Sequence, residues 1–122
     1  MSLIAFRHVS LLVADLDRAR AFYEGILDLK INPGRPDMTF SGVWYDIGDM
    51  QIHLMCLPNP EAGLIRPEHG GRDRHIAFSV SDMDELETRL SQTNISFSVS
   101  RSGRKALFCR DPDHNALEFI SD

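Results

Sequence analysis

The stretch that decides the fold is RHVSLLVADLD at residues 7–17, which returns as RHIAFSVSDMD at residues 74–84. Both stretches open with Arg-His and close with Val-x-Asp-x-Asp, and matching positions lie 67 residues apart in a chain of 122 residues. An internal repeat indicates two similar structural units, because each copy of the pattern builds the same local structure. The repeat therefore predicts a duplicated fold in which His8 and His75 occupy equivalent points.

The composition is typical of one compact globular domain, with 43% apolar and 25% charged residues. The formal net charge is −5, and the chain has no dense run of lysine and arginine. Nucleic acid is therefore not an expected partner, because binding to a phosphate backbone needs a positive surface.

The sequence also bears on where the protein works. No run of 18 apolar residues occurs, so a membrane span is not expected, and the N-terminal residues lack the pattern of a secretory signal. The two cysteines, Cys56 and Cys109, form neither a CxxC pair nor a disulfide framework. We therefore expect a reduced, cytoplasmic setting in which both thiols are buried.

Hydrophobic periodicity predicts the same order of elements, β-α-β-β-β, in both halves of the chain. Asp15 and Asp82 are the expected N-caps of the two helices, which should span residues 17–27 and 83–92. The expected strands cover residues 6–14, 28–32, 39–47, 51–57, 74–80, 96–100, 105–110 and 115–120. Three prolines and three glycines make residues 58–72 the expected linker. The predicted fold class is therefore α+β, one domain over residues 1–122 with βαβββ modules at about residues 3–57 and 73–122.

Four positions carry the expected chemistry: His8 and His75 on the opening strands, and His53 and Glu118 on the closing strands. Apolar residues flank both His53 and Glu118, so each polar side chain should leave its strand on the face opposite its neighbours. Three imidazoles and one carboxylate then meet at a common centre. These ligands suit Zn²⁺, Ni²⁺, Fe²⁺, Mn²⁺ or Co²⁺, and positions left open for water or substrate would make the site catalytic.

The register of the closing strands leaves one alternative open. At the strict offset of 67 residues, the partner of Glu118 is Gln51 and not His53. We favour His53, because its apolar neighbours match those of Glu118 and because imidazole is the better ligand. His69 and His114 lie in loop and turn contexts, and we expect both to be solvated.

Basic and aromatic residues suggest how a substrate would be held. Arg101, Arg104 and Lys105 surround a glycine, and Arg74 precedes His75. Such clusters favour an anionic ligand, although a charged hairpin edge that resists aggregation explains the same residues. Trp44 is a candidate substrate contact. Trp44 and Tyr45 are adjacent on a strand, so their side chains should point to opposite faces. This alternation alone does not decide which of the two faces the cavity.

These residues resemble the vicinal oxygen chelate superfamily, which includes glyoxalase I, methylmalonyl-CoA epimerase, fosfomycin-modifying transferases, extradiol dioxygenases and bleomycin-binding proteins. The resemblance covers almost the whole chain. It rests on three groups of residues: 7–9 with 13–19 and 22–23, then 74–78, and finally 111–113 with Asn115, Leu117, Glu118 and Phe119. It implies that the two modules curl mixed sheets around a shared, metal-lined cavity, with ligands at His8, His53, His75 and Glu118.

The resemblance also implies a function. We expect a metal-dependent enzyme of the glyoxalase type, a lyase, an isomerase or a thiol-addition catalyst, that acts on a small oxygenated, anionic molecule. Glu118 would be a ligand that also moves a proton once it loosens from the metal. The alternatives are an Fe²⁺ dioxygenase of the extradiol type and a non-catalytic binding protein like those of bleomycin resistance. A homodimer is expected, with each site inside one chain or shared between two copies.

Overall fold

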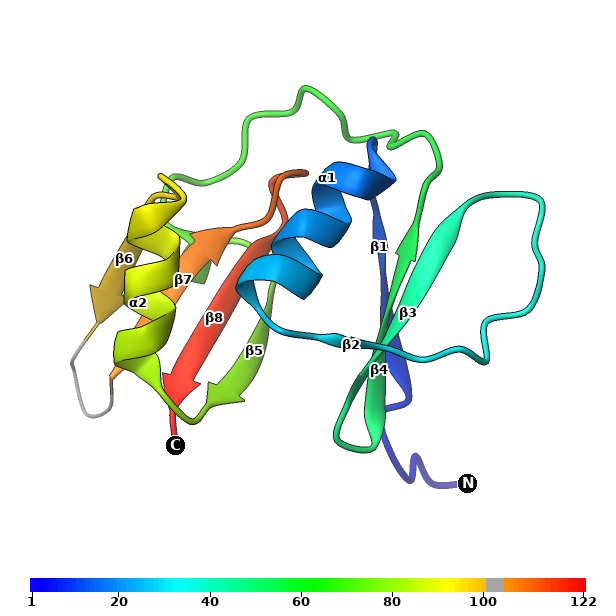
Figure 1. Ribbon diagram of the computed structural model, residues 1–122, viewed down its shortest axis with the longest axis horizontal. Helices are drawn as coiled ribbons and strands as arrows, with labels where there is room; N and C mark the ends of the chain where they lie inside the picture. The colour runs from blue at the N-terminus through cyan, green and yellow to red at the C-terminus, as the bar shows by residue number, and fades with distance from the viewer. Residues whose placement is uncertain (101–104) are drawn as a thin grey trace. The chain divides into compact units, whose positions relative to one another are not determined.

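A computed structural model describes residues 1–100 and 105–122 of the chain (Figure 1). The chain forms two compact units, Met1–Pro60 and Glu61–Asp122, called unit 1 and unit 2 below. Each unit contains a four-stranded mixed sheet with a helix after its first strand, in the order β-α-β-β-β. The α+β prediction with two tandem βαβββ modules is therefore confirmed.

Unit 1 contains β1 (His8–Leu12), α1 (Leu16–Arg20), η1 (Ala21–Ile26), β2 (Lys30–Ile31), β3 (Gly42–Ile47) and β4 (Met50–Met55). Its strand order is β1-β4-β3-β2, with β1 parallel to β4 and the other pairs antiparallel. Unit 2 contains η2 (Gly70–Arg72), β5 (His75–Val80), α2 (Met83–Gln92), β6 (Phe97–Ser100), β7 (Ala106–Arg110) and β8 (Ala116–Ser121). Its order, β5-β8-β7-β6, repeats that of unit 1.

The matched aspartates of the repeat start the two helices. The Asp15 carboxylate accepts the backbone N–H of Arg18 at 3.0 Å, and the Asp82 carboxylate accepts that of Glu85 at 2.9 Å. Each carboxylate thus satisfies one of the N–H groups that a helix leaves unpaired at its start. This capping role explains why both aspartates recur in the repeat.

The first helix differs from the expected α-helix over residues 17–27. Its second half, η1, is a π-helix, in which the Leu27 N–H donates to the Phe22 carbonyl, five residues back, at 3.1 Å. A π-helix turns less per residue than an α-helix, so Phe22 and Tyr23, although adjacent, are both buried toward the sheet. The apolar spacing of residues 17–27 did not distinguish the two helix types.

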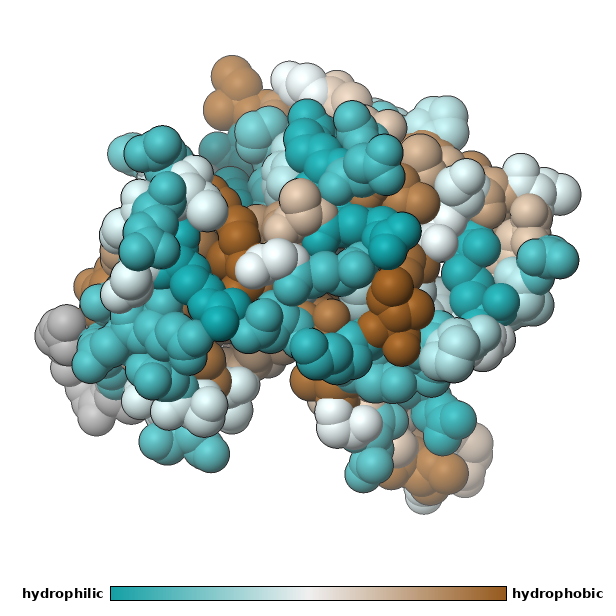
Figure 2. Space-filling view, in the orientation of Figure 1, coloured by the Kyte–Doolittle hydropathy of each residue, from teal (hydrophilic) through white to brown (hydrophobic). Residues whose placement is uncertain are grey.

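The core of each unit lies between its helix and one face of its sheet. In unit 1, the ring of Tyr23 stacks on Tyr45 at 6.1 Å, above buried Val43, Ile52 and Leu54. In unit 2, Leu86 and Leu90 of α2 are buried with Leu107, Leu117 and Phe119 of the sheet. The outward side of α2 is mostly hydrophilic, as the left part of Figure 2 shows. The other face of each sheet is thus left available for polar side chains.

The cysteines only partly match expectation. Cys109 is buried, and that burial raises the pKa of its thiol to about 12, so it is inert at neutral pH. Cys56, which follows the end of β4, is only half-buried. Both thiols are free.

Candidate functional site

In unit 1, three aromatic rings stack on the sheet face opposite the helix. His53 is paired with Ser10 on β1 and with Trp44 on β3, and His8 is paired with Gln51, so these side chains share one face. The ring of His53 lies between those of His8 and Trp44, at centroid distances of 4.0 Å and 4.1 Å and nearly parallel to both. Tyr45, in contrast, is fully buried on the helix side. Of these two adjacent residues, Trp44 is therefore the one that faces the histidines.

The surroundings of His53 favour its neutral form. It is 8% exposed, and burial lowers its pKa, with further lowering from the charges of His8 and Arg35. Its Nε2 atom lies 2.8 Å from the Gln51 side-chain oxygen. Because neutral imidazole is the form that binds a metal ion, this environment suits a ligand. His53 and Gln51, the two candidates for the counterpart of Glu118, thus contact each other.

A depression of about 630 Å³ opens beside this stack. It is lined by Arg7, His8, Met38, Trp44, Asp46, Gly48, Asp49, Met50, Gln51 and His53. All these residues belong to unit 1, so the depression is a property of that unit alone.

In unit 2, His75 and Glu118 face each other on neighbouring strands. The His75 Nε2 atom lies 3.5 Å from a Glu118 carboxylate oxygen, and the side chains are 27% and 14% exposed. The Nδ1 atom of His75 lies 2.8 Å from the Asp73 backbone carbonyl. A carbonyl only accepts, so the Nδ1 N–H donates to it and Nε2 is the ring atom that faces Glu118. This arrangement orients an imidazole for metal binding.

The two pairs occupy equivalent positions in their sheets. Ser10 on β1 is opposite His53, and Ala77 on β5 is opposite Glu118. The opening strands are offset by 67 residues and the closing strands by 65, because unit 2 is two residues shorter between them. His53, and not Gln51, is therefore the structural counterpart of Glu118.

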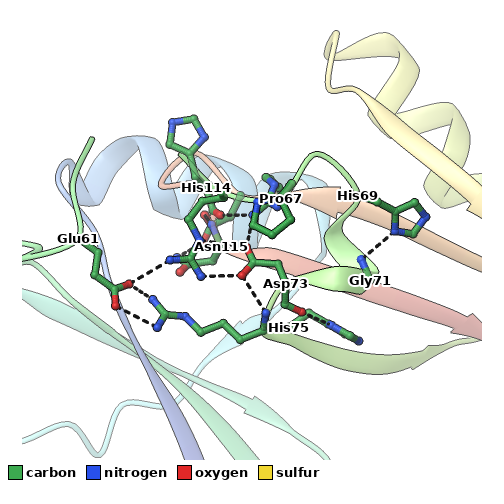
Figure 3. Close-up of polar contacts among 12 residues, drawn as sticks. Glu61, Pro67, His69, Gly71, Asp73, His75, His114 and Asn115 are labelled. Carbon is green, nitrogen blue, oxygen red and sulfur yellow. Dashed lines mark hydrogen bonds and ion pairs between the residues drawn. The ribbon is translucent and has the colours of Figure 1, made fainter. Parts of the chain in front are cut away.

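Asp73 is a site residue that the sequence reasoning missed (Figure 3). Its carboxylate accepts from Arg66 at 2.6 Å and 3.1 Å, from Arg110 at 2.9 Å and from the Arg74 backbone at 2.8 Å. These partners, Arg66 first, hold the pKa of Asp73 well below its usual range. Asp73 thus fixes the start of β5 and, through its carbonyl, the ring of His75. The one sequence clue to Asp73 was its place just before Arg74-His75. The equivalent residue of the first repeat is Phe6, so the aspartate is not part of the repeat.

The basic residues predicted to hold substrate have other partners where the structure describes them. Arg74 pairs with Glu61 through its two terminal guanidinium nitrogens, Nη1 and Nη2. Lys105 Nζ lies 3.2 Å from Asp84 and 3.4 Å from Glu87 on α2. Arg101 and Arg104 lie outside the described residues. A role for these four in substrate binding stays a prediction.

The two loop histidines differ from each other. His114 is exposed, in a left-handed turn with φ 68°, as expected for a solvated residue. His69 is also exposed, but its Nδ1 accepts the Gly71 N–H at 3.0 Å and its ring packs on Phe108 at 4.9 Å. It caps η2, a structural role that the loop composition did not reveal.

Across residues 1–100 and 105–122, no three His, Cys, Asp or Glu side chains gather closely enough to hold a metal ion. The four predicted ligands form two pairs instead, His8 with His53 in unit 1 and His75 with Glu118 in unit 2. Among the described helices, none has the length and apolar character needed to cross a membrane.

Comparison with known proteins agrees with the fold. Glyoxylase I 4 of Arabidopsis thaliana is 31% identical over 99% of this chain and 72% of its own length. A lactoylglutathione lyase of Haemophilus influenzae is 29% identical over 94% of this chain and 90% of its own. The crystal structure of a glyoxylase/bleomycin resistance protein/dioxygenase domain from Frankia sp. EAN1pec is 33% identical, with a TM-score of 0.74 over 98% of this chain and 93% of that one. The family model matches residues 5–119, and the chain therefore belongs to the glyoxalase/bleomycin resistance protein/dioxygenase superfamily.

Proposed function

We propose that the protein is a metal-dependent enzyme of the glyoxalase type, a lyase, isomerase or thiol-addition catalyst. Its substrate would be a small, oxygenated, anionic molecule. The observation that carries the proposal is the equivalence of the two pairs: His8 and His53 stand in unit 1 where His75 and Glu118 stand in unit 2. The relatives named as a glyoxylase and as a lactoylglutathione lyase support the same reaction class.

The donor groups fit a divalent cation of the Zn²⁺, Ni²⁺, Fe²⁺, Mn²⁺ or Co²⁺ type. Burial lowers the pKa of His53 and so favours its neutral form, and the Nδ1 of His75 donates to a backbone carbonyl, which leaves Nε2 for a metal. His8, His53, His75 and Glu118 would hold the ion. When bound, the ion would polarise a substrate that offers two neighbouring oxygens and stabilise the oxyanion formed from it.

The chain's own residues would bind the substrate and move its proton. Glu118 is mostly buried and 3.5 Å from the His75 ring, so its carboxylate, once free, would accept a proton in a site with little water. Trp44 presents a flat ring beside His53 against which a small molecule would pack. The depression in unit 1 would supply the room.

Each unit supplies only two of the four donors, so the proposed site needs a second unit. That unit is either the other half of the same chain or the corresponding half of a second copy, and we propose a homodimer. We also propose a cytoplasmic setting, because Cys56 and Cys109 are both free thiols.

Elemental analysis of protein purified without added metal tests the proposal. We expect about one equivalent of a transition metal in the wild type and a loss of most of it in His75→Ala and Glu118→Gln. His114→Asn is the matched control, because it removes an exposed histidine and asparagine tolerates the left-handed backbone there. Full metal content in both ligand variants would refute the site.

Three assays separate the proposed function from its alternatives. Oxygen consumption with catechols by the Fe²⁺-loaded protein would favour a dioxygenase. A metal-free protein that binds an aromatic drug without turnover would favour sequestration. Anaerobic conversion of a hemithioacetal by the metal-loaded protein is the result that the proposal expects.

A further inference from the structure

Arg35 is a half-buried arginine in the connection between β2 and β3, and its guanidinium is held in place. Its Nη2 donates to the Phe40 carbonyl at 2.8 Å, and its Cζ lies 5.5 Å from the centre of the Phe40 ring. A carbonyl bond and a ring contact fix the position of the group without neutralising its charge.

The guanidinium lies against the start of β3, the strand that carries Trp44. A Cβ atom added to Gly42 would stand 3.0 Å from Nη2 and 3.1 Å from Nε of Arg35. Gly42 and Trp44 are two positions apart on β3. The charge of Arg35 is also near enough to contribute to the lowered pKa of His53.

Arg35 has no carboxylate partner among the described residues, in contrast to the arginines that serve structural roles. Arg20 pairs with Glu24, and Arg66 and Arg110 both pair with Asp73. A fixed guanidinium with unpaired N–H groups is suited to a planar or tetrahedral oxyanion, which it can bind with two parallel hydrogen bonds.

We propose that Arg35 binds the anionic group, a carboxylate, phosphate or phosphonate, of the small molecule received by the His8–His53–Trp44 face. The proposal rests on the proposed function for the identity of that molecule as substrate. It places the anion-binding residue in unit 1, whereas the basic residues singled out from the sequence all lie in the second half of the chain. The competing interpretation is that Arg35 only fastens its loop through Phe40.

Trp44 provides the readout, because it is the sole tryptophan of the chain and stacks on His53. Its fluorescence is titrated with methylphosphonate and with glycolate, in chelator-treated protein at low ionic strength, so that no metal ion contributes. We expect a saturable change in the wild type and binding weaker by about tenfold or more in Arg35→Gln. Arg35→Lys keeps the charge but not the planar fork, and should fall between the two.

Arg18→Gln is the matched control, because it removes one positive charge from an exposed position on α1 of the same unit. It should bind within about twofold of the wild type. Thermal unfolding of each variant is followed by circular dichroism, and if Arg35→Gln does not fold, weaker binding by folded Arg35→Lys supports the proposal.

Four results would overturn it. They are no saturable change in the wild type, unchanged binding in folded Arg35 variants, an equal loss in Arg18→Gln, and dependence on Arg7, which lines the depression, in place of Arg35. Because the titration contains no metal, its result does not depend on the metal content measured for His75→Ala and Glu118→Gln.

Discussion

Replacing Asp73 with asparagine tests the claim that this carboxylate fixes the start of β5. Asp73 has only 6% of its side chain exposed and accepts hydrogen bonds from Arg66 and Arg110. A hydrogen bond to a charged group contributes about 1.5–3 kcal/mol. Adding the contributions of the two arginines overstates the loss of stability, because the asparagine amide retains one acceptor. Arg110 also keeps its hydrogen bonds to the carbonyls of His114 and Pro67 at 2.7 Å and 2.6 Å. We therefore expect Asp73→Asn to lower the free energy of unfolding by about 2 kcal/mol.

Urea denaturation at pH 7 measures this loss. With a slope of about 1–3 kcal/mol per molar urea, the midpoint should fall by about 1 M. Asp37→Asn is the matched control, since Asp37 is exposed in a loop of unit 1, and its effect should stay within about 0.5 kcal/mol. A stability for Asp73→Asn equal to that of Asp37→Asn would refute the reasoning.

Three further predictions concern the helices and the assembly. The Arg20 hydrogen bond lowers the pKa of Glu24, so Glu24→Gln should cost about 0.5–1 kcal/mol at pH 7. That cost should shrink as the pH falls below about 4.5 through the lowered pKa, which denaturation at pH 7 and pH 3 would check. Asp82→Ala should cost about 1 kcal/mol in urea through loss of the cap of α2, and no change would contradict that role. If sites are shared between copies, mixing metal-free His8→Ala and His75→Ala should restore metal binding, because a mixed dimer contains one intact site; sites inside one chain should give no recovery.

Much of the fold was predictable because the repeat and the hydrophobic periods are local signals. The Asp15 and Asp82 caps, the order of the strands and the bounds of α2 all follow from short-range physics. The equivalence of the positions of His53 and Glu118 also followed from their matching apolar neighbours, and the strand register agrees with it.

The rest depended on contacts between distant parts of the chain. Asp73 gains its importance from Arg66 and Arg110, and a lone aspartate before a strand does not reveal such partners. Arg35 lies in a turn whose sequence says nothing of its approach to Gly42. Likewise, Arg74 and Lys105 looked available in the sequence, but each has a carboxylate nearby in the fold.

X-ray absorption spectroscopy at the edge of the bound metal counts the imidazole rings around the ion. We predict three imidazoles and a carboxylate on one ion in the wild type, and a count lower by one ring in each of His8→Ala, His53→Ala and His75→Ala. An ion surrounded by water and carboxylates alone, or a count that none of these substitutions changes, would show that these histidines do not bind the metal together.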